Sequence, residues 1–190
     1  MARTIKKNVK QDILKSVEEL VAKIGVNSIS LGDIAKKCDI SKGTLYYYYS
    51  SKDDIIFDII VKHVKELEEE YLEWIERHKE DLTPERFLGV IFNKGVKLFD
   101  RAKMHIFLIN ECIKGNDMLR DKFNELWFAW QKKLEVGVLQ AFKDIEDAES
   151  FAYLLMLIID GLAIQEVMQG KFIGDDKLIE VVKKIGEKQC

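Results

Sequence analysis

The residues best suited to contact a phosphate or a base stand together at the start of one short predicted helix. Its first turn holds Lys42, Gly43 and Thr44, which are a cation, a residue without a side chain and a small hydroxyl. Ser41 stands just before them and can cap the helix. Because backbone N–H groups at a helix start point toward an approaching anion, this turn suits a phosphate or the edge of a base.

Four consecutive tyrosines follow at residues 46–49. They cannot all be core residues, because neighbouring residues on a helix point about 100° apart. Leu45 and Tyr49 are one turn apart and are predicted to face inward, which leaves Tyr46, Tyr47 and Tyr48 exposed. Their hydroxyls can reach phosphates, and their ring faces can contact sugars and thymine methyl groups.

A second short helix must hold this one in place. Ser30 can cap that helix with Asp33 three residues later, a carboxylate variant of the capping box. Asp39 can adopt the left-handed conformation that ends it. Two helices this short can share Ile34 and Leu45 in one core only if they cross steeply, which predicts a helix-turn-helix over residues 30–49.

About the first 60 residues resemble the DNA-binding domain of the TetR (tetracycline-repressor) family of bacterial transcriptional regulators. The matching positions are Ile13 to Gly25, Ser30, Ile34, Ala35, Ser41 to Tyr46, Tyr49, and Ser51 to Asp53. Two positions depart from the family pattern, with Asp39 where the family generally has Gly and Tyr49 where it generally has Phe. Asp tolerates the turn and Tyr is nearly isosteric with Phe, so the resemblance still implies the family's fold.

The residues and the resemblance together give one set of candidate DNA contacts: Ser30, Ser41, Lys42, Gly43, Thr44, Tyr46, Tyr47, Tyr48 and Lys52. Lysines and tyrosines of this set are expected mostly at phosphates. Gly43 and Thr44, with Lys42 or Tyr47, are expected at bases. The DNA-binding domain is predicted over residues 7–67.

The charge distribution agrees with DNA binding at one end of the chain. The 190 residues carry a net charge of -3, but residues 1–52 hold 10 Lys or Arg against 5 Asp or Glu. A basic N-terminal segment followed by an acidic remainder is typical of a protein that binds nucleic acid through one domain.

The rest of the chain is predicted to be helical. A single proline and 47% hydrophobic residues predict an all-α protein with a substantial core. After the helices expected at 9–24, 30–38 and 42–49, further helices are predicted at 52–78, 84–100, 104–113, 117–142, 147–168 and 175–188. The last five belong to an expected effector-binding and dimerisation domain over residues 68–190.

The helix within residues 150–170 is apolar on every side, so it must be buried on more than one face. One face can pack inward and the other against a second subunit. Its segment 157–162 also resembles the penultimate helix of TetR-family proteins, which implies a four-helix dimer interface. The predicted homodimer residues are Leu154, Leu155, Ile158, Gly161, Leu162 and Gln165.

Large or pliable apolar residues in the second domain predict a pocket for a small apolar or aromatic effector. Each alone is more often a core residue than a ligand contact, because a helical domain needs such residues. The pocket candidates are Phe92, Phe99, Met104, Phe107, Cys112, Phe123, Trp127, Trp130 and Met156.

No catalytic or metal site is predicted. The three histidines and three cysteines show no metal-ligand spacing, and no phosphate loop or nucleophile motif is present. The longest apolar run, 151–159, is too short to span a membrane, so a soluble protein is expected. Three widely spaced cysteines form no disulfide framework, which favours a reducing cytoplasm, and no cofactor is expected. The resulting hypothesis is a repressor that binds an inverted-repeat operator as a homodimer. The alternative is a helical interaction or hydrophobic-ligand carrier module that does not bind specific DNA.

Overall fold

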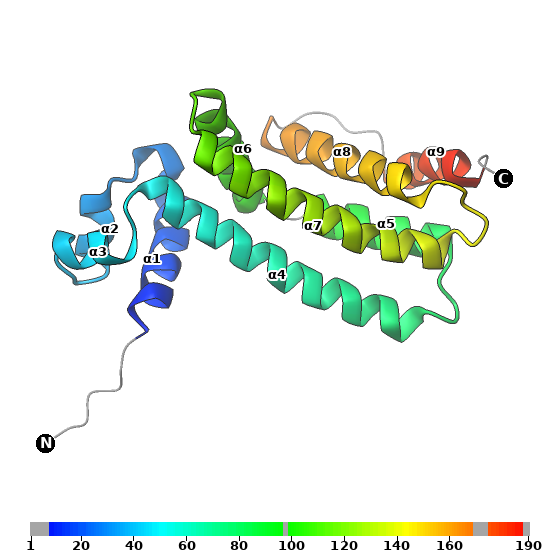
Figure 1. Ribbon diagram of the computed structural model, residues 1–190, viewed down its shortest axis with the longest axis horizontal. Coiled ribbons are helices and arrows are strands. Elements are labelled where there is room, and N and C mark those ends of the chain that lie inside the picture. The colour runs from blue at the N-terminus through cyan, green and yellow to red at the C-terminus, as the bar shows by residue number, and fades with distance from the viewer. Residues whose placement is uncertain (1–7, 97–98, 169–174, 188–190) are drawn as a thin grey trace, which may run out of the picture. The chain divides into compact units, whose positions relative to one another are not determined.

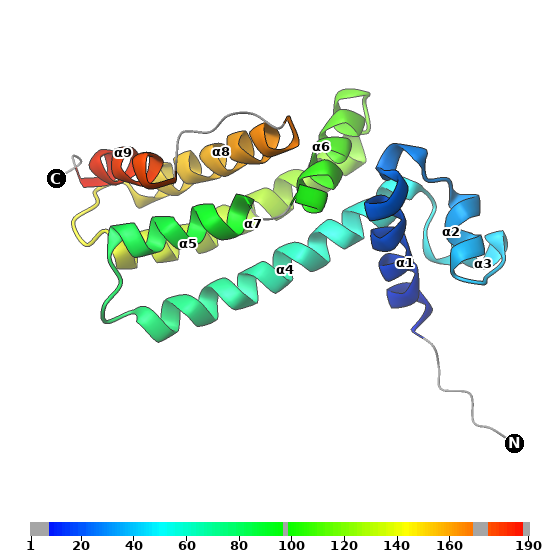
Figure 2. The same cartoon turned by 180° about the vertical axis from the view of Figure 1, so that it is seen from behind.

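The computed structural model describes residues 8–96, 99–168 and 175–187, and all regular structure in these ranges is helical (Figures 1 and 2). The chain divides into two compact units, one formed by the residues up to His63 with Lys103–Asp121, the other by Val64–Ala102 with the residues from Lys122 onward. The α helices are α1 Val9–Ile24, α2 Leu31–Lys37, α3 Lys42–Tyr48, α4 Lys52–His78, α5 Pro84–Val96, α6 Phe99–Ile113, α7 Asp117–Ala141, α8 Ala148–Val167 and α9 Asp175–Glu187. A short 3-10 helix covers Val26–Ser28. The predicted all-α class is confirmed.

One predicted helix boundary was wrong. A break was expected at residues 101–103, but these residues lie inside α6, which begins at Phe99. Arg101, Ala102 and Lys103 all favour helix, and no Gly or Pro stands there to end one. The end of the helix predicted at 84–100 was wrong as well, because Phe99 and Asp100 belong to α6. The remaining predicted helix ends of this half lie within about one residue of the observed bounds, since the chain carries stop and start residues such as Gly115 and Pro84.

The first unit is built on the crossing of α1, α2 and α3. Ile13, Ile34 and Leu45 are fully buried and form the common core of these three helices. The Ser30 capping box forms as predicted, with the Asp33 backbone N–H donating to Ser30 Oγ at 3.2 Å. Asp39 has φ +54°, the left-handed conformation expected at the turn between α2 and α3.

The second unit is a helical bundle with its own core. Helix α5 packs against both α8 and α9, and Gln131 on α7 donates a hydrogen bond to the Glu149 carbonyl on α8. Of the residues that the structure describes, seventeen buried ones fill the interior, among them Phe87, Phe92, Leu134, Phe142, Phe151 and Leu155. Two phenylalanine pairs, Phe87 with Phe142 and Phe142 with Phe151, pack edge to face at 6.4 and 4.9 Å. The core is therefore aromatic at the centre.

Gly137 marks a close approach of α7 to this core. A Cβ atom there would overlap the Tyr71 hydroxyl and lie 2.6 Å from the Phe87 ring. We expect Gly137→Ala to lower the free energy of unfolding by about 1–3 kcal/mol, because the buried rings cannot move aside freely. Gly43→Ala is the control, since the nearest atom to its Cβ is Ser41 Oγ at 3.7 Å. Urea unfolding measures both, and equal effects of the two substitutions would contradict this packing.

Candidate DNA-binding site

Helix α3 is held by a single core side chain and leaves the rest of its surface to solvent. Leu45 is 0% exposed, whereas Tyr46, Tyr47 and Tyr48 are 55, 84 and 39% exposed. The rings of Tyr47 and Tyr48 lie edge to face with centroids 5.2 Å apart. The inward and outward faces of the tyrosine run are as predicted.

The start of α3 is fixed by its cap. The Thr44 backbone N–H donates to Ser41 Oγ at 3.0 Å, and the Ser41 and Thr44 hydroxyls lie 2.9 Å apart within one hydrogen bond. Lys42 and Gly43 in this turn are exposed. A helix start with an open backbone, a lysine and two hydroxyls can bind a phosphate or a base edge.

Ser30 is committed to the capping box of α2. Its hydroxyl donates to Asp33 Oδ2 at 2.6 Å, and its backbone N–H donates to the same oxygen at 3.0 Å. These two hydrogen bonds from Ser30 lower the pKa of Asp33 below its usual value. Ser30 therefore fixes the start of α2. Ser30 is itself exposed to solvent.

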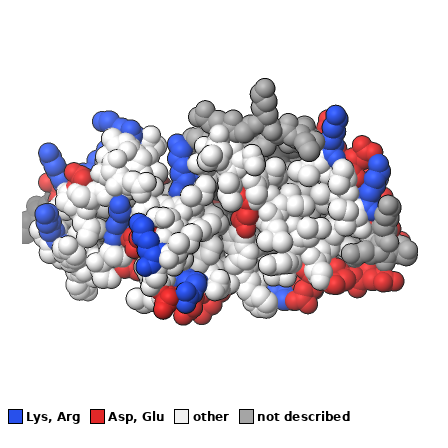
Figure 3. Space-filling view, turned by 90° about the horizontal axis from the view of Figure 1, so that it is seen from above, with Lys and Arg blue, Asp and Glu red and all other residues white. Residues whose placement is uncertain are grey.

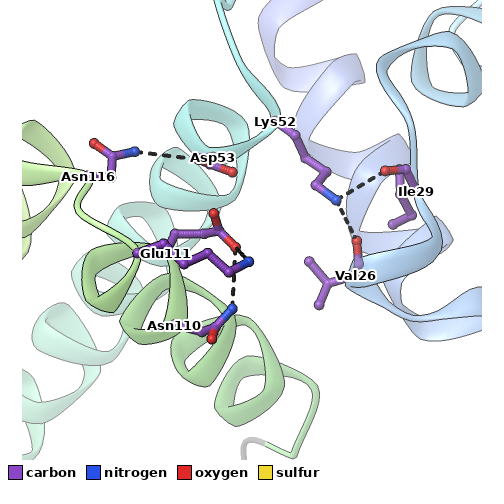
Figure 4. A network of polar contacts seen from close by, with 8 residues as sticks. Val26, Ile29, Lys52, Asp53, Asn110, Glu111 and Asn116 are labelled. Carbon is purple, nitrogen blue, oxygen red and sulfur yellow. Dashed lines mark hydrogen bonds and ion pairs between the residues drawn. The ribbon is translucent and has the colours of Figure 1, made fainter.

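Lys52 has a different environment from the predicted phosphate contact. Its Nζ donates to the carbonyls of Val26 and Ile29, at 3.1 and 3.2 Å (Figure 4). The same atom lies 5.1 Å from the centre of the Phe107 ring. These contacts join the start of α4 to the segment before α2 and to α6. The sequence could not show them, because the accepting groups are backbone carbonyls distant along the chain.

A second polar link joins α4 to the turn between α6 and α7. Asn116 Nδ2 donates to Asp53 Oδ2 at 3.5 Å, and the Glu111 side chain lies beside them (Figure 4). Burial raises the pKa of Asp53, and the neighbouring Glu111 carboxylate raises it further. Sequence reasoning missed this pair, since no motif relates residues 63 positions apart.

The predicted pocket residues are divided between the two units. Met104, Phe107 and Cys112 belong to the first unit, and the others belong to the second. Phe92, Met104, Phe107 and Met156 are buried, whereas Cys112, Phe123, Trp127 and Trp130 are half-buried. The side chain of Phe99 lies outside the described residues. Phe123 and Trp127 stack with centroids 5.7 Å apart.

A cavity of about 150 Å³ in the second unit is lined by other residues: Pro84, Ala141, Phe142, Lys143, Asp144, Ile145, Gly186 and Glu187. None of the predicted pocket residues borders it. Half-buried Asp160 on α8 is a polar group of the second unit, and burial raises its pKa to about 7.

The predicted dimer residues lie on two faces of α8, and Leu155 was a wrong choice because it is fully buried in its own subunit's core. Leu154, Ile158 and Leu162 are half-buried against the same core, while Gly161 and Gln165 are exposed. The outward apolar side chains are instead Tyr153, Leu157, Ile164 and Met168. A helix that is apolar all round does not show in its sequence which face turns inward.

Helix α8 is also long and apolar enough to cross a membrane, with 20 residues and a mean hydropathy of 1.6. Its buried residues, Ala148, Phe151, Ala152, Leu155 and Met156, all lie in its first half and pack in the second unit. Within the described ranges, no three His, Cys, Asp or Glu side chains are placed to bind a metal ion.

Residues 13–59, which span α1 to the second turn of α4, match the family model of bacterial regulatory proteins of the tetR family. This segment therefore resembles the DNA-binding domain of TetR-family regulators. The match includes the Ser30 cap, the whole of α3 and Lys52, so the resemblance predicted from the sequence is confirmed.

The sequence is also similar to individual curated regulators, in one case over more than the TetR-type segment. The chain is 27% identical over 119 residues to the fatty acid metabolism regulator protein of Bacillus subtilis, covering 60% of this chain and 58% of that protein. It is 38% identical over 53 residues to the HTH-type transcriptional regulator QacR of Staphylococcus aureus, or 28% of each chain. The chain thus spans less than two thirds of these curated relatives, which are regulators rather than enzymes.

The fold as a whole is shared with solved structures. The transcriptional regulator FadR from Bacillus subtilis, in complex with stearoyl-CoA, superposes with a TM-score of 0.66 at 21% identity, covering 95% of this chain and 98% of that one. At this identity the likeness shows the fold alone, over 95% of the chain.

The position of Lys52 yields a testable prediction. Lys52→Met keeps the aliphatic stem but leaves the Val26 and Ile29 carbonyls without their donor, which should lower the free energy of unfolding by about 1–3 kcal/mol. Exposed Lys36 on α2 is the control, and Lys36→Met should change stability by less than about 0.5 kcal/mol. Urea denaturation followed by circular dichroism measures both. Equal stability of Lys52→Met and wild type would show that the buried link is unimportant.

Proposed function

We propose that this protein is a cytoplasmic transcriptional repressor that binds an inverted-repeat operator as a homodimer and is released by a small apolar or aromatic effector. The observation that carries the proposal is the surface of α3. Its one buried side chain, Leu45, fixes the helix, while Tyr46, Tyr47 and Tyr48 remain exposed. A monomer folded for stability alone gains nothing from three adjacent exposed aromatic residues.

Helix α3 can insert into the major groove with its capped start toward the DNA. Lys42 supplies a cation, the tyrosine hydroxyls supply donors for phosphates, and Gly43 permits close approach to a base edge. Figure 3 shows Lys and Arg side chains over the part of the surface formed by the N-terminal helices. Lys52 is left out of the proposed contacts, because its ammonium group is already bound to Val26 and Ile29.

The proposed dimer follows from the length of α3 and from the surface of α8 and α9. A helix of 7 residues reads only a few base pairs, so a specific site requires two of them about one DNA turn apart, ~34–36 Å. Leu157, Ile164 and Met168 on α8 are 49, 47 and 72% exposed, and Val181 and Ile185 on α9 are 56 and 41% exposed. Gly161 on the same side of α8 would allow a partner helix to approach closely.

The effector proposal rests on the apolar interior of the second unit and on the relatives. One relative is named a fatty acid metabolism regulator, and one solved structure of the same fold contains stearoyl-CoA. Release would use the contacts of α6 with α4. Because Asn116 binds Asp53 and Phe107 faces Lys52, a shift of α6 would move the start of α4 beside the reading helix.

The direct test is fluorescence anisotropy on labelled duplexes tiled across the DNA flanking the protein's gene, with excess unrelated DNA as competitor. We expect tight binding to a fragment that contains an inverted repeat. Apolar and aromatic compounds, including long-chain acyl-CoA, are then added to that complex to find one that releases it. Equal, weak binding to duplexes of every sequence would contradict the proposal and favour a carrier module.

The exposed tyrosines give a specific prediction. Tyr47→Ala should weaken operator binding at least about tenfold while leaving the melting temperature unchanged, because the side chain is 84% exposed and contributes nothing to the core. Phe128→Ala is the matched control, since it removes a 58% exposed aromatic ring from the second unit. Anisotropy titrations of both variants provide the comparison. An unchanged affinity of Tyr47→Ala would exclude this face as the DNA contact.

The dimer face gives another prediction. Leu157→Glu should produce monomers, because a charge would have to be buried between two copies of α8. Leu72→Glu on α4 is the control, since Leu72 is comparably exposed, at 39% against 49%, but lies outside the proposed face. Analytical ultracentrifugation measures the mass of each variant. A dimer of Leu157→Glu would place the interface elsewhere.

A further inference from the structure

The end of α3 is held by a polar cluster that the DNA contacts themselves do not include. Tyr49 follows the last residue of α3, and its side chain is 5% exposed. Its hydroxyl donates to Asp58 Oδ2 on α4 at 2.9 Å. Lys10 on α1 pairs with the same carboxylate oxygen at 2.7 Å, and its Nζ lies 5.5 Å from the centre of the Tyr49 ring.

One carboxylate oxygen therefore joins α1, the end of α3 and α4. Burial and the hydrogen bond to Asp58 raise the pKa of Tyr49, so its hydroxyl stays protonated and remains a donor. Tyr49 is 5% exposed, compared with 30% for the Asp58 side chain and 53% for the Lys10 side chain, so Tyr49 is the most buried member of the cluster.

The orientation of α3 requires a second anchor of this kind. Leu45 is the only buried side chain within the helix, and one apolar contact leaves the helix free to rock about it. The Tyr49 backbone N–H donates to the Leu45 carbonyl at 3.0 Å, so the position of Tyr49 is coupled directly to the last turn of α3. That turn carries Tyr46, Tyr47 and Tyr48.

We propose that Asp58 is a positioning residue for sequence recognition: through the Tyr49 hydroxyl it sets the angle at which α3 presents its tyrosines to DNA. This role rests on the proposed function. Neither residue contacts DNA in this scheme. The cluster instead limits the movement of α3, so that base contacts form at one register while phosphate contacts alone tolerate small changes of angle.

The test uses the full chain and a duplex recovered by wild-type protein from a randomised pool, with a scrambled duplex of equal length as the non-specific probe. Tyr49→Phe removes only the hydroxyl, and Phe is the residue that the family pattern generally has at this position. We expect the ratio of specific to non-specific affinity to fall about tenfold, since a hydrogen bond to a charged group is lost, while non-specific affinity changes less than about twofold.

Two further variants separate positioning from stability. Asp58→Ala should lower the same ratio, and combining it with Tyr49→Phe should lower it no further, because both remove one link. Lys62→Met is the control, since it removes one of the two α4 side chains that contact Glu18 on α1, where His63 remains, and should leave the ratio unchanged. All measurements are made at a temperature and salt concentration at which circular dichroism shows each variant to be fully folded.

The outcomes are distinct. An unchanged ratio in Tyr49→Phe, or equal losses in Tyr49→Phe and Lys62→Met, would overturn the positioning role while leaving specific DNA binding intact. If wild-type protein enriches no sequence from the pool, the proposed function itself is overturned, and the positioning role with it.

Discussion

The burial of Leu45 is the constraint on which the rest of the first unit depends. It is the only buried side chain of α3, and Ile13 of α1 and Ile34 of α2 are fully buried in the same unit. Because this single residue turns inward, the remaining positions of α3 turn outward by helical geometry. The exposed tyrosines thus follow from the position of one leucine.

Polar contacts fix the orientation of α3, which a single buried apolar side chain leaves undetermined. Ser41 caps the start of α3, Tyr49 ties its end to Asp58, and Lys52 ties the start of α4 to the carbonyls of Val26 and Ile29. The Ser41 hydrogen bond lies within the first turn of α3, whereas those of Tyr49 and Lys52 join separate elements. Hydrogen bonds of a charged group add orientation as well as stability, so these links fix the angle of a very short helix.

The sequence was most informative where local rules decide the structure. The Ser30 cap, the left-handed Asp39 and the inward Leu45 depend on residues within one or two turns, and all were predicted correctly. It was least informative where distant groups meet. The environment of Lys52 depends on carbonyls 23 and 26 residues away in the sequence, and the hydrogen bond of Asn116 to Asp53 joins residues 63 positions apart. On α8 the prediction that Leu155 faces outward was wrong, because a helix that is apolar on all sides has no polar face that shows which side is exposed. The boundary predicted between residues 67 and 68, and the DNA and effector contacts, remain predictions.

The central claim is that two copies of α3 read two half-sites. Hydroxyl-radical footprinting of the protein on a duplex that it selects tests this most directly, because it maps backbone protection at single-nucleotide resolution. We expect two protected segments related by two-fold symmetry, with centres about one helical turn or somewhat more apart, ~34–36 Å at the least. A single unsymmetric segment, or uniform protection along the whole duplex, would contradict it.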